Sequence, residues 1–139
     1  MRRLAAALLL LAACSVGDGI DLYDEAGLET ATNVEVELIA GGGGVGRWVT
    51  VNDTALVAAM AESLDESLAT RDAADCAPSY QVRFFRDDGS VVALGYGCRD
   101  GRPLLTGPPL PVGEGVTAPD EFVDLVDAEA GLLDDQSGP

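Results

Sequence analysis

Three glycines, Gly41, Gly43 and Gly46, have the spacing G-x-G-x-x-G that the phosphate-binding loops of dinucleotide enzymes use. In such enzymes the glycines open a helix, whose N-terminal amides and dipole hold the pyrophosphate. In this chain they lead into residues 47–51 (RWVTV), whose β-branched and aromatic residues indicate a strand. We therefore expect the Gly41–Gly46 segment to be a glycine-rich hairpin loop, and we expect no nucleotide cofactor.

Carboxylates are the other side chains that could do chemistry. The chain of 139 residues has 24 Asp and Glu residues and no histidine. The lack of histidine excludes Ser-His-Asp and Cys-His nucleophiles and histidine-based zinc sites. A glycosidase-like pair of carboxylates is still allowed, but among so many acids some pair falls at a suitable distance by chance. We expect a protein that is not an enzyme.

The acidic residues near the N-terminus could suggest a calcium loop. Asp18, Asp21, Asp24 and Glu25 are close in sequence, but the D-x-D-x-D-G spacing that wraps one ion is missing. Residues 15–32 are polar and show no sustained periodicity. They are interpreted as a solvated acidic tether, without a metal.

The N-terminus has the pattern of an export signal. Arg2 and Arg3 precede an apolar run that ends in Leu11-Ala12-Ala13-Cys14, and this run is too short for a membrane-spanning helix, which needs about 20 residues. The last four residues resemble a bacterial lipobox. The resemblance implies that residues 1–13 are removed and that Cys14 is lipidated, which places the protein outside the cytoplasm, anchored to a cell membrane.

The charge of the mature chain limits its partners. Without residues 1–13, six arginines remain against 24 acids, a side-chain charge of about −18. A field of this sign repels nucleic acid and anionic headgroups and attracts cationic partners. We expect no nucleic-acid partner.

Residues 79–97 predict a β-hairpin around Asp87-Asp88-Gly89. A three-residue loop, with Gly89 in the left-handed conformation, places all six large side chains on one face, whereas a two-residue loop splits them. The pairs expected from this register are Arg86 with Ser90, Phe84 with Val92, Val82 with Leu94 and Tyr80 with Tyr96. In the same register Cys98 lies opposite Pro78, two residues from Cys76. The two cysteines are an even pair in an oxidising compartment, so a disulfide that clamps the hairpin is expected.

Other elements follow from periodicity. Val34, Val36 and Leu38 alternate with glutamates and predict a strand with its acids outward. Apolar stripes predict helices over residues 54–69, capped by Asp53, and 118–133, with a capping box at Thr117. Residues 103–106 suggest a short edge strand, and the Pro108–Pro111 segment a stiff extended loop.

These elements predict an α+β domain with an antiparallel sheet of about four or five strands, two amphipathic helices and one disulfide. The organisation expected is signal peptide 1–13, lipidated cysteine and tether 14–32, one domain 33–133, and a disordered tail 134–139. The order of strand, helix and disulfide-closed hairpin after a lipobox resembles small bacterial envelope lipoproteins. That resemblance implies a location and a fold but no activity.

A binding role is the leading functional hypothesis. Trp48, the only tryptophan, and Tyr80 and Tyr96 are of the types favoured in interfaces, and could form one contact corner with an envelope protein; the competing interpretation is that Trp48 covers the core. Two alternatives remain open: an acidic inhibitor of a basic secreted enzyme, similar to lysozyme-inhibitor lipoproteins in acidity and size, and a small solute-binding or calcium-binding module.

The lipobox makes a direct prediction. A Cys14→Ala variant has no thiol to acylate, and the membrane affinity of the chains, about 0.8 kcal/mol per buried CH₂, is lost. The variant should move from the membrane fraction to the soluble fraction, as measured by fractionation and immunoblotting. Retention in the membrane fraction would contradict the lipoprotein assignment.

Overall fold

The computed structural model describes residues 19–39 and 47–136, with side chains described up to residue 133. The expected signal peptide 1–13, the expected lipidation site Cys14 and the glycine motif Gly41, Gly43 and Gly46 all lie outside the described residues. In the described ranges, no helix combines the length and the apolar character that crossing a bilayer requires.

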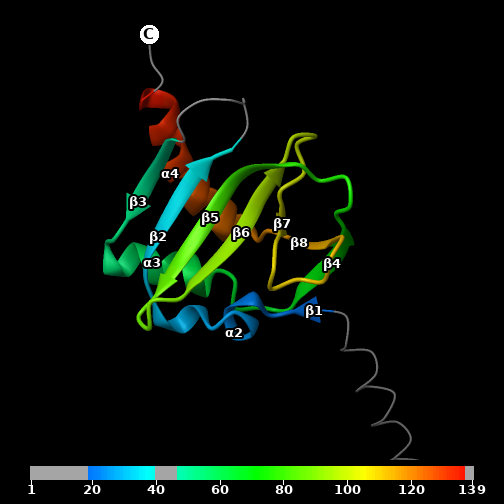
Figure 1. Cartoon of the computed structure of the whole chain (residues 1–139), viewed down its shortest axis with the longest axis horizontal. Coiled ribbons are helices and arrows are strands. Elements are labelled where there is room, and N and C mark those ends of the chain that lie inside the picture. Colours follow the sequence, from blue (N-terminus) through cyan, green and yellow to red (C-terminus); the bar gives the residue numbers. More distant parts are fainter. Residues whose placement is uncertain (1–18, 40–46, 137–139) are drawn as a thin grey trace, which may run out of the picture.

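The described chain folds into one antiparallel sheet with three α-helices (Figure 1). The strands are β1 Gly19–Ile20, β2 Ala31–Leu38, β3 Arg47–Val51, β4 Leu68–Asp72, β5 Pro78–Arg86, β6 Val91–Cys98, β7 Leu104–Thr106 and β8 Glu114–Thr117; the helices are α2 Leu22–Glu25, α3 Thr54–Glu62 and α4 Asp120–Gln136, with a 3₁₀ turn, η1, at Leu28–Thr30. The eight strands lie in the order β1-β4-β8-β7-β6-β5-β2-β3. The α+β class is confirmed, with more strands than the four or five expected.

The β5–β6 hairpin has the predicted register. The observed pairs are Tyr80 with Tyr96, Val82 with Leu94 and Phe84 with Val92. The Arg86 N–H donates to the Ser90 carbonyl at 2.9 Å, and Gly89 has φ +87°. The three-residue loop is therefore confirmed, and its left-handed position is filled by the residue that adopts it without steric cost.

The sheet has one covered and one open face. Side chains of β2, β5 and β6 that share a face with Phe84 pack with α3 and α4 into the main core, and in Figure 1 α4 runs behind these strands. The fully buried members of this core include Val34, Val36, Val57, Met60, Leu64, Val82, Phe84, Leu94, Phe122 and Val126. We call the opposite side of β3, β2, β5 and β6 the open sheet face; it is formed by Trp48, Thr50, Glu35, Glu37, Gln81, Arg83, Phe85, Val91 and Ala93.

Helix α3 is shorter than the predicted helix over residues 54–69. Its start is as expected, because the Asp53 side chain accepts the Leu56 N–H at 3.0 Å. It ends at Glu62, where the Ser63 hydroxyl donates to the Met60 carbonyl at 2.6 Å. Serine and aspartate after this point compete for backbone hydrogen bonds and do not favour a helix interior. The prediction was wrong beyond Glu62, and Leu68 is buried as the first residue of β4 instead.

Helix α4 begins and ends later than the predicted range of 118–133. Thr117 is not its cap, because Thr117 pairs with Leu104 in the sheet. The helix starts at Asp120, after Pro119, and continues to Gln136. Residues 134–136, expected to lie in a disordered tail, therefore belong to the helix. The predicted apolar stripe is confirmed by the burial of Phe122, Val126 and Leu133.

The acidic segment expected to be a tether up to residue 32 is folded from Gly19 onward. Leu22 and Leu28 are fully buried in the main core. The Arg86 guanidinium donates to the Ala26 carbonyl at 2.7 Å and to the Ser90 hydroxyl at 2.7 Å, which ties the segment to the hairpin loop. A four-residue helix and a 3₁₀ turn are too short to show a period in the sequence, so the tether interpretation was wrong for these residues.

The chain after the hairpin adds two strands inside the sheet. Residues 104–106 were expected at an edge, but β7 lies between β6 and β8, and Leu105 is fully buried. Strand β8 follows the proline segment and was not expected. A Cβ at Gly115 would lie 2.7 Å from the Leu105 carbonyl oxygen, so glycine permits this close approach of β8 to β7.

The predicted disulfide between Cys76 and Cys98 is present and closes a sequence separation of 22 residues around the hairpin. Cys98, Ala73 and Leu104 form a second, smaller core beside it. The bridge therefore joins the hairpin to the β4 and β7 part of the sheet.

The disulfide should contribute to stability mainly by restricting the unfolded chain. Replacing both cysteines, Cys76→Ala with Cys98→Ala, should lower the free energy of unfolding by about 3 kcal/mol, the value expected for a loop of this size. Urea unfolding followed by circular dichroism measures the change. A loss below about 1 kcal/mol would contradict this role of the bridge.

Candidate functional site: the open sheet face

Tyr80 and Tyr96 lie on the covered face, next to α4. Their ring centroids are 6.3 Å apart, and the Tyr96 ring meets Phe122 edge-on at 5.6 Å. The Tyr96 hydroxyl donates to Asp127 Oδ1 at 3.1 Å. Burial, followed by the negative charge of Asp127, raises the pKa of Tyr96 well above its usual range. Tyr96 is thus a core residue with a satisfied hydroxyl.

Trp48 lies on the other face of the sheet from these tyrosines. Across the strands β3, β2 and β5, Tyr80 is in line with Leu38 and Arg47. Trp48 is in line with the neighbouring residues Glu37 and Gln81. Because neighbouring residues of a strand point to opposite faces, the expected corner of Trp48, Tyr80 and Tyr96 does not form. The Trp48 side chain does not cover the core, since 51% of its surface is exposed.

Arg83 joins two strands at the centre of the open sheet face. Its guanidinium contacts Glu35 Oε1 at 3.0 Å and Glu37 Oε1 at 2.6 Å. It also donates to Gln81 Oε1 at 2.6 Å. All three charged side chains are about a quarter exposed, so the pairs contribute modestly to stability. Their main effect is to hold four polar side chains in fixed positions beside Trp48.

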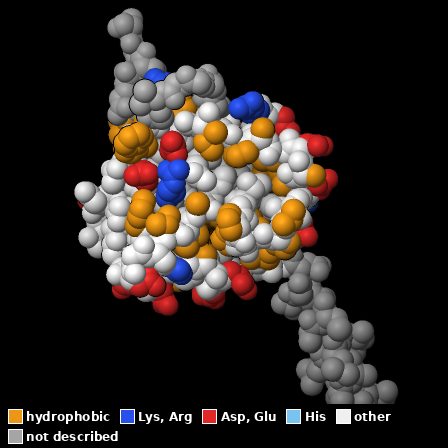
Figure 2. Space-filling view, in the orientation of Figure 1, with side chains coloured by type: hydrophobic (Ala, Val, Ile, Leu, Met, Phe, Trp, Pro, Cys, Tyr) orange, Lys and Arg blue, Asp and Glu red, His pale blue; other side chains and the backbone are white. Residues whose placement is uncertain are grey.

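The open sheet face combines apolar and polar groups. Figure 2 shows this face, with hydrophobic side chains spread over it and many acidic side chains along its lower and right-hand margins. Val91 is exposed and Phe85 half-buried at the β5–β6 end. An exposed aromatic ring beside fixed hydrogen-bonding groups is suited to contact with another protein.

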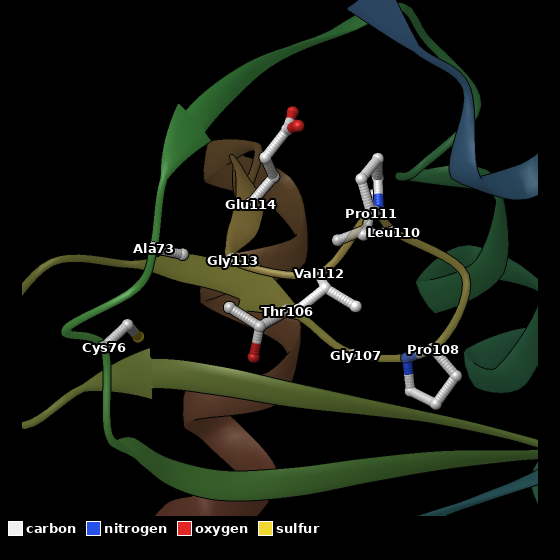
Figure 3. Close-up of a pocket in the computed structure, with 10 residues that line it drawn as sticks. All are labelled: Ala73, Cys76, Thr106, Gly107, Pro108, Leu110, Pro111, Val112, Gly113 and Glu114. Atoms are coloured by element: carbon white, nitrogen blue, oxygen red, sulfur yellow. The ribbon is translucent and has the colours of Figure 1, made fainter.

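The proline segment borders two shallow hollows. One, of about 310 Å³, is lined by Cys76, Thr106, Glu114 and the loop from Gly107 to Gly113 (Figure 3). The other, of about 350 Å³, lies between Pro109, Val91 and Arg86. Both are at the lower limit for small-molecule pockets. Each has a single carboxylate in its described lining, and neither offers the paired acids of a glycosidase.

Three carboxylates converge where α2 meets the chain after α3. Oxygens of Asp21, Asp24 and Asp65 lie within 4.8 Å of one another. These are the described residues whose carboxylates come close enough to share one hard cation. Asp21 and Asp24 are close in the sequence, whereas 41 positions separate Asp24 from Asp65, so the sequence does not indicate that Asp65 belongs to the cluster and only the fold brings the three together. Asp18 lies outside the described residues.

The carboxylate cluster changes the ionisation of Asp65. A hydrogen bond with the Asp21 carboxyl group is the largest cause that raises the pKa of Asp65, followed by desolvation and the negative charge of Asp21 and Asp24. Within the cluster the Asp21 side chain also accepts the Asp24 N–H at 3.2 Å as the cap of α2. The cluster is therefore a site of charge repulsion at neutral pH.

Comparison with known proteins adds no family to these observations. Searches of protein-family models, curated proteins and solved structures found no match to this chain.

The carboxylate cluster predicts a pH-dependent stability change. The pKa of Asp65 is higher in the folded protein than in the unfolded chain, so ionised Asp65 lowers stability at neutral pH, and this cost disappears as the pH falls through the raised value. Asp65→Asn should therefore raise the midpoint of urea unfolding at pH 7 and leave it unchanged in acid. Glu66→Gln, at an exposed neighbouring position outside the cluster, is the control. Equal shifts for the two variants at pH 7 would argue against specific repulsion.

Proposed function

We propose that this protein is a lipid-anchored, extracytoplasmic binding protein of the bacterial envelope, without enzymatic activity of its own, and that its open sheet face binds another protein. The observation that carries the proposal is the half-exposed Trp48 on a sheet face that no helix of the described chain covers. A tryptophan exposed beside fixed polar side chains is typical of the centre of a protein interface.

The polar groups around Trp48 favour protein contact. Glu35 and Glu37 are already paired with Arg83, so covering them does not bury an isolated charge. Gln81 is held in the same network. A partner can therefore cover Trp48 at a lower desolvation cost than an unpaired acidic surface would impose.

The anchor supports a location close to the membrane. Gly19, where the described fold begins, follows Cys14 by five residues, which span at most about 18 Å. A lipid on Cys14 would therefore hold the domain beside the bilayer. The negative charge of the chain favours partners with a basic surface.

Site-directed photocrosslinking in cells tests the proposed function. A photoreactive residue is placed at position 50, where Thr50 is exposed next to Trp48 on the open sheet face, or at position 132, where Leu132 is 45% exposed on α4. Position 50 should capture one dominant envelope protein that position 132 does not capture. The purified partner should then bind Trp48→Ser about tenfold or more weakly than wild type and bind Leu132→Ser normally.

Other outcomes separate the alternatives. Equal capture from both positions, or unchanged binding of Trp48→Ser, would contradict a role of the open sheet face. If the captured partner were a basic secreted hydrolase that loses activity in the complex, the protein would be an inhibitor, and the binding face would still be the proposed one.

A further inference from the structure

Strand β3 has an outer edge that no other strand of the described chain pairs with. It pairs with β2 on one side and is the last strand of the sheet on the other. Its five residues, Arg47 to Val51, contain no proline, glycine or lysine, and three of them are β-branched. Proteins usually protect such edges with charges, prolines, bulges or very short strands. Among the described residues, β3 carries one such protecting feature, the charged Arg47 at the start of the strand.

The hydrogen-bond ladder decides which β3 groups face this edge. The Ile39 N–H donates to the Ser79 carbonyl at 2.9 Å, so odd-numbered residues of β2 are bonded to β5. In an antiparallel sheet the bonding direction alternates along a strand. Even-numbered residues of β2 are therefore bonded to β3. One such residue is Val36, which is in register with Val49 of β3.

The same alternation leaves Trp48 and Thr50 facing outward. If the backbone groups of Val49 are directed to β2, those of Trp48 and Thr50 are directed to the free edge. Their side chains lie on the open sheet face, and both are exposed. The edge thus offers two N–H and two C=O groups next to the residue that carries the proposed function.

We propose that β3 binds an extended segment of a partner protein as an added antiparallel strand, and that this segment alternates basic with β-branched residues. The proposal rests on the proposed function and specifies how the open sheet face binds. Main-chain hydrogen bonds to Trp48 and Thr50 provide the affinity, and alternate side chains provide the specificity.

The alternation follows from the two faces of β3. Residues of the added strand opposite Trp48 and Thr50 project onto the open sheet face. A lysine or arginine there lies beside the Trp48 ring, where a cation is favoured, and in the field of a chain with net charge −16. Residues opposite Val49 project to the covered face, where Val49 is packed against the core. A β-branched side chain fits that position.

The place of β3 in the sheet leaves room for a partner. β1 and β3 are the two end strands, and Figure 1 shows them on opposite sides of the molecule. Seven strand spacings separate them, roughly 30 Å. A lipid attached before β1 would therefore leave the β3 edge on the far side of the domain from the attachment point.

Binding of a designed peptide to the full-length protein in detergent tests the proposal. The probe is a peptide of about ten residues that alternates lysine and valine, and the fluorescence of Trp48, the only tryptophan, reports binding. A glutamate–valine peptide and a lysine–glycine peptide control for charge and for strand propensity. The lysine–valine peptide should bind and protect Trp48 from acrylamide quenching, and neither control peptide should do so.

Variants of Thr50 separate strand addition from other binding. Thr50→Pro removes an outward N–H without touching the β2 ladder and should weaken binding about tenfold. Thr50→Ala keeps the N–H and should bind like wild type. In the wild-type complex, hydrogen exchange at the Trp48 and Thr50 amides should slow, whereas the Val49 amide is already protected without peptide.

Three results would overturn strand addition: no binding of the lysine–valine peptide, equal binding of Thr50→Pro and wild type, or unchanged exchange at the Trp48 and Thr50 amides. If Thr50→Pro also left binding of the photocrosslinked partner unchanged while Trp48→Ser abolished it, the face would bind as proposed and only the strand-addition mode would fail. Circular dichroism of Thr50→Pro and Thr50→Ala establishes that both fold.

Discussion

The burial of one face of the β5–β6 hairpin is the constraint on which the rest of the structure depends. Val82, Phe84 and Leu94 are fully buried. A shift of one residue in the pairing would move all of them to the open side, at a cost of about 1.5–3 kcal/mol for each exposed side chain. The register is therefore fixed, and with it the positions of β2, α3 and α4, which pack on the same face.

The same constraint creates the open sheet face. Since side chains alternate along a strand, fixing Phe84 inward fixes Arg83 outward, directly opposite Glu35. The ladder that places Val49 against the core turns the amide of Trp48 toward the free edge. The binding surface proposed for this protein is thus the reverse side of the core, held rigid because the core is close-packed.

The features that the sequence predicted correctly are local. Asp87, Asp88 and Gly89 specify a turn, and the alternation on either side of it is complete enough to give the register and the Cys76–Cys98 bridge. Asp53 marks the start of α3 for the same reason, since a cap needs only the next three residues. The features that it missed, β1, α2, β4 and β8, are too short to show a period, and their stability comes from contacts with distant segments.

The sequence by itself determined the α+β class, the hairpin register and the disulfide, because each depends on residues close together in the chain. Only the tertiary structure decided that Trp48 and the tyrosines lie on opposite faces, that Arg83 lies between two glutamates, and that Asp65 meets Asp21. These relations depend on which strands become neighbours. Strand order is set by the burial of the whole core, and neither composition nor spacing within one segment encodes it.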